Sequence, residues 1–377
     1  MDEQLPLWRE TDEAFERQQL SSKAASKVAR FYSPQLDGLR FIAAMLVFLH
    51  HAPKLPYIAT LQKFGWVGVD LFLAISAFLI TKLVLIEHQR TGQFSVRAFF
   101  IRRALRIWPL YLGYATLACI VSALFHVVTT KEALLWWASH LTFTNNLRTA
   151  AEGFSRVSFS AHLWTISLEE QAYIAMAFLL ALFTSRQASK SSALWFCLTG
   201  TALALLIRVV MALNLSVEAT IWTLPIRADA FLLGALAAIL DLRGKPWISV
   251  VGIALVATVY FSPDGEPLGL YNAIDYSVIA AGLVILVITA QTKAFLKPLG
   301  NPVARYLGKV SFGFYVFHGF TLWAASRLGM RLGYSPMVET MAAFVTTVVI
   351  SALSYRLFET PFLVIKERFA RVESRPI

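Results

Sequence analysis

The sequence predicts an all-α integral membrane protein, and its composition and hydropathy pattern both lead to this fold class. Hydrophobic residues make up 57% of the 377 residues, charged residues make up 15%, and the mean hydropathy is +0.60. Soluble domains contain about 45–50% apolar and about 25% charged residues, so these values exclude an ordinary soluble protein and a disordered chain. The apolar residues also fall into separate runs close to the ~20 residues that a spanning helix needs.

Ten such runs are candidates for transmembrane helices. In chain order they cover about 38–53, 66–86, 108–128, 163–183, 193–213, 221–240, 247–261, 272–290, 310–328 and 338–358. A further segment, 133–146, is apolar but too short and too polar to span. Its Trp136 and Trp137 favour a helix in the membrane interface.

The distribution of Lys and Arg predicts the orientation. The net charge is +11, which in a soluble protein would suggest a nucleic-acid partner. In so apolar a chain it indicates the cytoplasmic side of a membrane protein, and no nucleic-acid partner is expected. With the N-terminus in the cytoplasm, 23 of the 34 basic residues fall on that face and seven on the other. We therefore expect about ten spans, with both termini cytoplasmic.

The chain is expected to form one membrane domain with two tails. Residues 1–32 are polar, lack the apolar stretch of a cleavable signal peptide, and predict a cytoplasmic N-terminal tail. Residues 33–362 hold the spans, and residues 363–377 predict a cytoplasmic C-terminal tail.

Ionisable residues near the cytoplasmic face form the first candidate site. Arg103 and Arg106 are three residues apart and share a helix face. Two guanidinium groups there form a clamp that suits phosphates. The alternative is a positive anchor for lipid headgroups. Other charged residues at this depth are Asp37, Arg40, Arg102, Arg356 and Glu359.

A second group of polar residues is predicted to lie deeper in the membrane or toward its outer face. His51 follows Arg40 by eleven residues, or ~16 Å along a helix, so it lies at mid-span or beyond. A neutral imidazole beside a carboxylate forms a general-base pair. A hydrogen-bonded packing histidine is the alternative, as is burial of Glu169 or Glu170 against Arg208 or Arg227. The group comprises His50, His51, Asp70, Glu169, Glu170, Arg227, Asp229 and His318.

Other signature motifs are not found. The sequence contains no P-loop, Gly-x-Ser-x-Gly elbow, His-Glu-x-x-His or Cys-x-x-Cys motif. We therefore expect no metal site and no tightly bound cofactor. Gly65 and Gly68 permit close backbone approach, which helix packing alone would explain.

Seven segments, in this order, resemble the membrane acyltransferase-3 family, and together they cover about 33–362. The first contains an Arg followed eleven residues later by the family's essential His, matching Arg40 and His51. The second has Ala77 where the family usually has Gly, and the third matches the family's Arg-x-x-Arg motif at Arg103 and Arg106. The segments are 36–51 (LDGLRFIAAMLVFLHH), 68–80 (GVDLFLAISAFLI), 103–111 (RALRIWPLY), 162–173 (HLWTISLEEQAY), 227–234 (RADAFLLG), 307–318 (LGKVSFGFYVFH) and 358–362 (FETPF).

The resemblance implies an O-acyltransferase that moves an acyl group, most often acetyl, from cytoplasmic acyl-CoA to a hydroxyl. Family acceptors include glycans of the bacterial envelope, so a carbohydrate acceptor and a bacterial inner membrane are expected. Because the chain ends about 15 residues after Phe362, we expect a stand-alone member without the additional C-terminal domain of some relatives.

The roles that follow for individual residues are also expectations. Arg103 and Arg106 would bind the CoA phosphates, and Arg40 would position the thioester or brace Asp37 or Glu359. His51 would act as general base or carry the acyl group, and Glu170 would orient its imidazole. The matched motifs add supporting residues: Asp37, Asp70, Ser76, Tyr111, Trp164, Ser167, Arg227, Asp229, His318 and Glu359.

Three alternatives remain open from the sequence. The donor could carry a succinyl or longer acyl group, and the acceptor could be something other than a glycan. A polytopic lipid or glycan transporter, or a sensory or scaffold protein, would also suit the spans. The outer segment 129–161 is a candidate for acceptor contact, with an interfacial anchor as the alternative. Its residues that suit sugar faces and hydroxyls are Trp136, Trp137, Asn145, Asn146 and Arg148.

Overall fold

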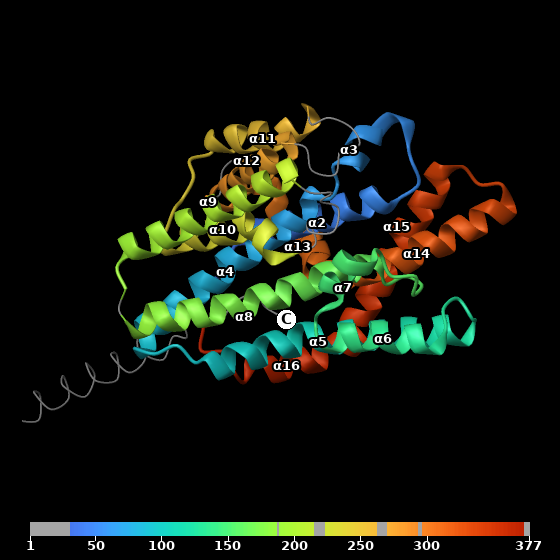
Figure 1. Cartoon of the computed structure of the whole chain (residues 1–377), viewed down its shortest axis with the longest axis horizontal. Coiled ribbons are helices and arrows are strands. Elements are labelled where there is room, and N and C mark those ends of the chain that lie inside the picture. The colour runs from blue at the N-terminus through green and yellow to red at the C-terminus, as the bar shows by residue number, and fades with distance from the viewer. Residues whose placement is uncertain (1–30, 187, 215–222, 262–269, 293–295, 373–377) are drawn as a thin grey trace, which may run out of the picture.

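The computed structural model is helical, with no strand in the part of the chain that it describes (Figure 1). That part covers residues 31–186, 188–214, 223–261, 270–292 and 296–372. Nearly all of the predicted N-terminal tail, and the last five residues of the predicted C-terminal tail, lie outside it.

A helix occupies each of the ten expected ranges. These helices are α2 (Pro34–His51), α4 (Val67–Thr91), α5 (Val96–Leu124), α8 (Trp164–Ser185), α9 (Lys190–Asn214), α10 (Ala228–Ile239), α11 (Ile248–Ala257), α12 (Leu270–Thr289), α14 (Ser311–Leu332) and α15 (Pro336–Ser354). Five helical segments in the described residues are long and apolar enough to cross a membrane. They are Val67–Thr91, Val96–Leu124, Ala161–Ser185, Lys190–Leu213 and Pro336–Glu367. The count of ten spans and the orientation of the termini stay predictions.

Shorter elements connect these helices. They are η1 (Pro56–Ile58), α3 (Ala59–Lys63), α6 (Thr130–Leu141), α7 (Asn145–Glu152), η2 (Ala161–Leu163), η4 (Leu224–Arg227), η5 (Thr258–Phe261), η6 (Lys297–Gly300), α13 (Pro302–Lys309) and α16 (Thr360–Glu367). A helix over part of 133–146 was expected, and α6 confirms it. Its Trp136 is buried, while Trp137 is partly exposed and donates to Thr116.

Helix α5 begins twelve residues before the expected span. The Ser95 hydroxyl accepts a hydrogen bond from the Ala98 amide at 3.2 Å, which caps the helix at Val96. The helix then continues through Pro109 to Leu124. The expected span started at 108 because charges in the first turns lower the hydropathy of a segment that is nevertheless helical. Arg103, Arg106 and Tyr111 therefore belong to one rigid element.

The last long helix contains a π-helical turn. Residues Tyr355–Glu359 join α15 to α16, and the combined segment runs to Glu367, beyond the expected end at 358. Such turns change the direction in which side chains project and are frequent at functional sites. Residues 363–367, expected to form part of a tail, are helical and pack against α5.

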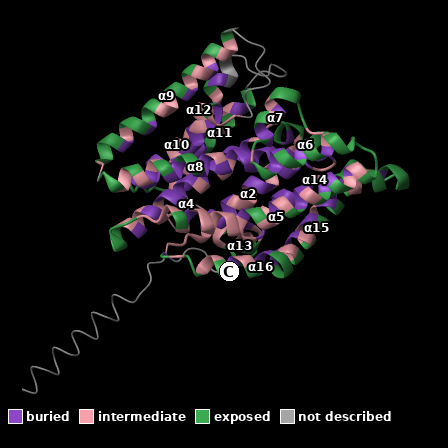
Figure 2. Cartoon of the chain, turned by 60° about the horizontal axis from the view of Figure 1, so that its bottom comes forward, coloured by how far each residue is buried: buried purple, intermediate pink, exposed green. Residues whose placement is uncertain are grey.

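The core lies around α4, which packs against α2, α8, α10 and α12. A Cβ atom at Gly65 would lie 2.2 Å from the Leu46 carbonyl oxygen, and one at Gly68 would lie 2.3 Å from that of Ala43. Both contacts are with α2, so the expected close helix approach is confirmed. Figure 2 shows buried residues concentrated on α2, α4 and α8, with exposed residues along α9.

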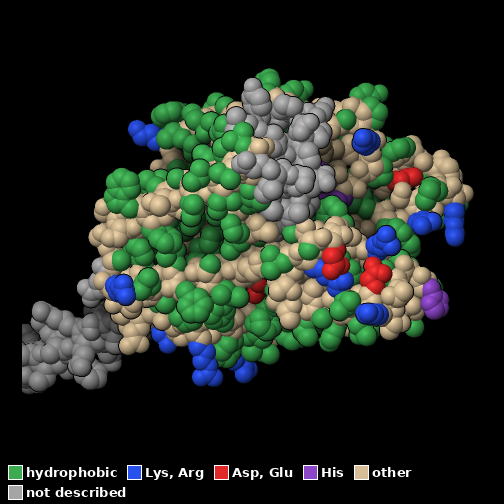
Figure 3. Space-filling view, in the orientation of Figure 1, with side chains coloured by type: hydrophobic (Ala, Val, Ile, Leu, Met, Phe, Trp, Pro, Cys, Tyr) green, Lys and Arg blue, Asp and Glu red, His purple; other side chains and the backbone are tan. Residues whose placement is uncertain are grey.

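Apolar side chains cover the outside of the bundle. Large exposed hydrophobic residues include Leu117 on α5, Leu206 on α9 and Val345 on α15. In Figure 3 hydrophobic side chains cover the middle of the visible face, and charged side chains gather toward its left and right ends. This distribution is that of a protein whose middle contacts lipid and whose two ends contact water.

Candidate functional site

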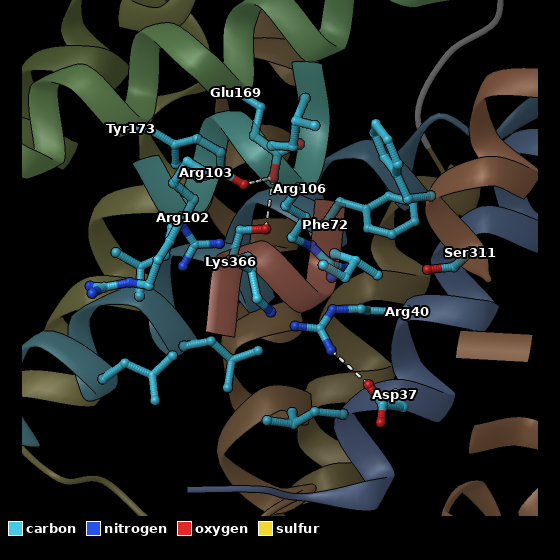
Figure 4. Close-up of a pocket in the computed structure, with 18 of the residues that line it drawn as sticks. Asp37, Arg40, Phe72, Arg102, Arg103, Arg106, Glu169, Tyr173, Ser311 and Lys366 are labelled. Carbon is cyan, nitrogen blue, oxygen red and sulfur yellow. Dashed lines mark hydrogen bonds and ion pairs between the residues drawn. The ribbon is translucent and has the colours of Figure 1, made fainter. Parts of the chain in front are cut away.

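A cavity of about 180 Å³ lies among α2, α4, α5, α8, α14 and α16. Five cationic side chains line it, as do four carboxylates. Figure 4 labels the cations together with Asp37 and Glu169. The cations are Arg40, Arg102, Arg103, Arg106 and Lys366, and the carboxylates are Asp37, Glu87, Glu169 and Glu367. The structure thus gathers residues from both ends of the sequence around one charged space.

Arg40 forms an ion pair with Asp37, which was one of the two carboxylates expected to brace it. Its Nη1 lies 2.8 Å from Asp37 Oδ1, and the Asp37 side chain is almost completely buried. Gly308 of α13 lies directly against the Asp37 backbone, because a Cβ there would approach the Asp37 carbonyl oxygen to 2.0 Å. The close packing of α13 therefore fixes the position of Asp37, and the ion pair with Asp37 fixes Arg40 at the cavity.

Arg103 and Arg106 both line the cavity, as their spacing on one helix face predicts. The Arg103 guanidinium lies over the Phe99 ring at 5.7 Å and the Tyr173 ring at 5.3 Å. These rings fix the guanidinium plane by cation–π contact without using its N–H donors. The buried Nε of Arg103 has no hydrogen-bond partner among the described residues. The arrangement suits an anion with several acceptor oxygens.

The adjacent glutamates of α8 have different surroundings. Glu169 lines the cavity and accepts hydrogen bonds from Ser76 at 2.8 Å and from Tyr173. Glu170 accepts a hydrogen bond from the Trp108 indole at 3.1 Å, and its other oxygen is buried without a partner in the described residues. The structure does not bring Glu170 to His51, so the expected contact between these two residues is wrong.

His51 has two other histidines beside it in place of the expected Glu170. The rings of His51 and His318 are 5.1 Å apart between centroids, and those of His318 and His162 are 4.4 Å apart. His318 and His162 are buried, whereas His51 is exposed. We call His51, His162 and His318 the histidine group. In the part of the chain that the structure describes, no cluster of side chains has the geometry to hold a metal ion.

Each ring of the histidine group has one nitrogen bonded to a backbone carbonyl. Nδ1 of His51 lies 2.8 Å from the Val47 oxygen, Nε2 of His162 lies 3.1 Å from that of Val316, and Nδ1 of His318 lies 2.5 Å from that of Tyr315. A carbonyl only accepts hydrogen bonds, so the bonded nitrogen carries the proton. In a neutral ring the other nitrogen then has a free lone pair, and His318 Nε2 is buried without a hydrogen-bond partner among the residues that the structure describes.

His162 was quoted within a family motif but not singled out as a site residue. It lies in η2, just before α8, and reaches His318 only because α14 packs beside it. Gly319 makes room for the ring, since a Cβ there would lie 2.8 Å from the His162 ring carbon Cε1. The only sequence signal for this contact is the pairing of a motif histidine with a distant glycine, and that pairing is visible only after folding.

Tyr315 connects the cavity to the histidine group. It lines the cavity, and its ring lies 5.6 Å from that of His162 and 5.5 Å from that of His318. Its hydroxyl donates to the His162 carbonyl oxygen at 2.6 Å. The two groups of polar residues that the sequence separated by depth are thus joined through one side chain.

Asp70, Arg227 and Asp229 belong to a buried ion-pair network away from the histidine group. Arg227 Nη1 lies 2.8 Å from Asp70 Oδ2, and Arg208 Nη2 lies 2.6 Å from Asp229 Oδ2. As expected from their spacing, Arg227 and Asp229 find different partners. Trp164 lies 5.7 Å from the Arg227 guanidinium. The alternative in which these arginines pair with Glu169 or Glu170 is therefore wrong.

The remaining supporting residues occupy two further positions. Tyr111 bonds to His140 at 3.0 Å and to Ser167 at 3.3 Å in a buried network that also contains Asn145. Glu359 is buried and accepts a hydrogen bond from Ser354 at 3.2 Å.

Segment 129–161 differs from the expectation at its asparagines. Asn145 and Asn146 are 2% and 0% exposed, and Asn146 bonds to Gln171. These two side chains hold α7 against α8 and do not face an outer acceptor. Arg148 lies over the Trp136 ring at 4.6 Å.

Comparison with known proteins connects this geometry to a family. The family model described as an acyltransferase domain matches residues 33–356. The protein named "Putative O-acetyltransferase SAS0844" of Staphylococcus aureus strain MSSA476 is 26% identical over 92% of this chain and 59% of its own length. The protein named O-acetyltransferase OatA of Staphylococcus aureus strain NCTC 8325 / PS 47 is 25% identical over 91% of this chain and 60% of its own length. The chain thus spans about three-fifths of these curated relatives. No solved structure matches.

Proposed function

The chain belongs to the acyltransferase-3 family and is an acyltransferase, and we propose that it transfers an acetyl group from cytoplasmic acetyl-CoA to a carbohydrate hydroxyl. One observation carries the proposal. The cavity lined by Arg40, Arg103 and Arg106 reaches Tyr315, whose ring lies 5.6 Å from that of His162 and 5.5 Å from that of His318. An anionic donor and an acceptor hydroxyl could thus meet from opposite directions.

The donor end of this proposal rests on charge. Acyl-CoA carries phosphates at one end and the thioester at the other. Guanidinium groups bind phosphate oxygens through paired N–H donors, which Arg103 and Arg106 supply from one face of α5. With the phosphates at these residues, the acyl arm extends along the cavity toward Tyr315. Arg40, oriented by Asp37, faces the same space.

The acceptor end rests on the histidine group. We infer that Nε2 of His51 accepts the proton of the acceptor hydroxyl while that oxygen attacks the thioester carbonyl. The C–S bond then breaks, and the departing thiolate takes the proton from the imidazolium to give free CoA. Since His51 is exposed while His318 and His162 are buried, His51 is the member that an acceptor can reach. His318 orients it through ring contact.

A variant of this mechanism has His51 carry the acyl group. The acyl-imidazole would form from acetyl-CoA without acceptor and then pass its acyl group to the hydroxyl. Mass spectrometry of the intact protein after incubation with acetyl-CoA alone distinguishes the two. A stoichiometric mass increase of one acetyl group on wild type but not on His51→Ala identifies the carrier mechanism.

The proposed function is tested with purified full-length chain in lipid nanodiscs. We expect acetyl-CoA to be consumed faster when an envelope glycan acceptor is added, and the glycan to gain the mass of one acetyl group. Absence of any acyl-CoA turnover, with transport of lipid or glycan instead, would support the transporter alternative. Turnover of succinyl-CoA or longer acyl-CoA in preference to acetyl-CoA would correct the donor. An O-acylated small molecule in place of a glycan would correct the acceptor.

A further inference from the structure

The C-terminal segment 360–372 forms part of the cavity wall. Leu363, Lys366, Glu367, Ala370 and Val372 all line the cavity. The region matched by the family model ends at residue 356, before this segment begins. The family match does not reach this segment, and the seventh motif (358–362) covers only its first three residues. Neither assigns a role to residues 363–372, although they lie against the space proposed for the donor.

Ion pairs and hydrogen bonds hold this segment in place. Arg102 of α5 donates from Nη1 to the Phe369 carbonyl oxygen at 2.7 Å, and its Nη2 lies 3.2 Å from Glu87 Oε2. The other oxygen of Glu87 lies 3.8 Å from Arg371. The Glu87 side chain is only 2% exposed, so α4 and α5 provide a buried anchor for the residues that follow α16. These contacts fix the segment in the wall of the cavity.

Lys366 is the residue of this segment that carries charge into the cavity. Its side chain is 13% exposed, and Figure 4 shows it among Arg40, Arg102, Arg103 and Arg106. Its Nζ lies 2.9 Å from Glu367 Oε1. A lysine has a flexible stem and a compact charge, so its ammonium group can move from a neighbouring carboxylate to a ligand with little change elsewhere.

The charges around the cavity favour an anionic partner for Lys366. Arg40 is paired with Asp37 and Arg102 with Glu87. Glu169, the carboxylate closest along α8, accepts hydrogen bonds from the neutral hydroxyls of Ser76 and Tyr173. The lining holds five cationic side chains and four carboxylates, so it carries a small net positive charge that favours an anionic ligand.

We propose that Lys366 binds a phosphate of the acyl-CoA donor, opposite Arg103 and Arg106, and that segment 360–372 is part of the donor site. This inference rests on the proposed function. Arg102 then acts as a positioning residue, because it fixes the backbone after α16 while its own charge is paired with Glu87.

Binding of coenzyme A by the purified full-length chain tests the assignment. We expect Lys366→Gln to raise the Kd for coenzyme A about tenfold, equivalent to about 1.4 kcal/mol. Lys366→Arg should keep most of the affinity, since it keeps the charge. Arg368→Gln is the matched control, because Arg368 is exposed two residues farther along and does not line the cavity. We expect its Kd to equal that of wild type.

Pantetheine separates a phosphate contact from a structural role. It shares the thiol arm of coenzyme A but has no phosphate, so Lys366→Gln should leave its binding unchanged. An equal loss of affinity for pantetheine and coenzyme A would overturn the proposal in favour of a structural role. So would an unchanged Kd for coenzyme A in Lys366→Gln.

The same titrations distinguish failure of the Lys366 assignment from failure of the proposed acyl-CoA donor. If wild type binds coenzyme A and transfers acyl groups while Lys366→Gln behaves like wild type, only the role of Lys366 fails. If wild type neither binds coenzyme A nor turns over any acyl-CoA, the proposed donor fails and the role of Lys366 fails with it.

Discussion

The imidazole rings of His51 and His318 lie 5.1 Å apart between centroids, although they come from α2 and α14. Each donates a ring N–H to a carbonyl of its own helix. The two rings therefore keep fixed orientations without a carboxylate partner. Because Nδ1 of His51 bonds to the Val47 carbonyl, Nε2 is the nitrogen that is free to accept a proton, which leads to the first prediction.

Replacing His51 with Ala should reduce acyl transfer by at least about 100-fold, because the group that accepts the hydroxyl proton is lost. The measurement is the rate of acetyl-CoA consumption with acceptor present. His50→Ala is the control, since His50 is also exposed but bonds to the Gln62 carbonyl oxygen at 2.8 Å, on α3. A His51→Ala protein with full activity, or equal losses in both variants, would contradict the role of His51.

Replacing Arg103 and Arg106 together with Ala should raise the KM for acetyl-CoA at least about 100-fold. Each charge-assisted contact with a phosphate contributes about 1.5–3 kcal/mol net of water, so the loss of two contacts weakens binding by at least about 3 kcal/mol. The KM for the acceptor should not change. Arg97→Ala is the matched control, because Arg97 is an exposed arginine two turns earlier on α5. A change confined to acceptor saturation would show that the pair does not bind the donor.

Replacing Glu170 with Gln should reduce the rate less than tenfold. The amide oxygen of Gln can still accept the hydrogen bond from Trp108, and Glu170 has no contact with His51 in the structure. Steady-state kcat and KM check this. A loss comparable to that of His51→Ala would instead support the catalytic role expected from the sequence.

Replacing Arg227 with Met should lower the free energy of unfolding by about 3–5 kcal/mol, because Asp70 would remain buried without its partner. The double variant Asp70→Leu with Arg227→Met should recover much of this loss. Denaturation of detergent-solubilised protein measures both. If the double variant were as unstable as the single variant, burial of an unpaired charge would not be the cause.

The stability of the protein should fall in mild acid through His140. Burial lowers the pKa of His140, on α6, from 6.5 to about 4. The unfolded chain therefore binds this proton first as pH falls, so stability is present above about pH 6.5 and is lost between about 6.5 and 4. The loss from this residue is about 3 kcal/mol.

Thermal unfolding of His140→Gln against pH measures this loss. We expect a weaker acid dependence in the variant than in wild type. His126→Gln, which replaces an exposed histidine, should keep the dependence of wild type. Identical pH profiles for wild type and His140→Gln would exclude His140 as the source.

The local sequence pattern was sufficient to predict where the helices lie and which residues share a helix face. Apolar runs predicted a helix at every expected range, and the spacing of Arg103 and Arg106 predicted that both would face one space. The spacing of Arg227 and Asp229 also predicted separate partners. Helix ends were less predictable at α5 and α16, because hydropathy does not report where hydrogen bonding stops.

Contacts between distant segments depended on packing. No sequence pattern states that His162 lies against His318 or that Glu170 faces Trp108. The first depends on how α14 packs beside η2, and the second on how α8 packs beside α5. The burial of Asn145 and Asn146 is a similar case, since the position of α7 against α8 decides it.

The apolar runs, together with the order and chemistry of the motifs, were sufficient to predict a helical membrane acyltransferase, while the orientation read from the basic residues stays a prediction. Hydropathy and charge act along a single helix, and for that reason they can be read from the sequence. The partner of His51 and the position of Lys366 in the cavity wall were decided only by the tertiary structure. They depend on how α8, α14 and α16 pack, and that packing depends on contacts between residues far apart in the chain.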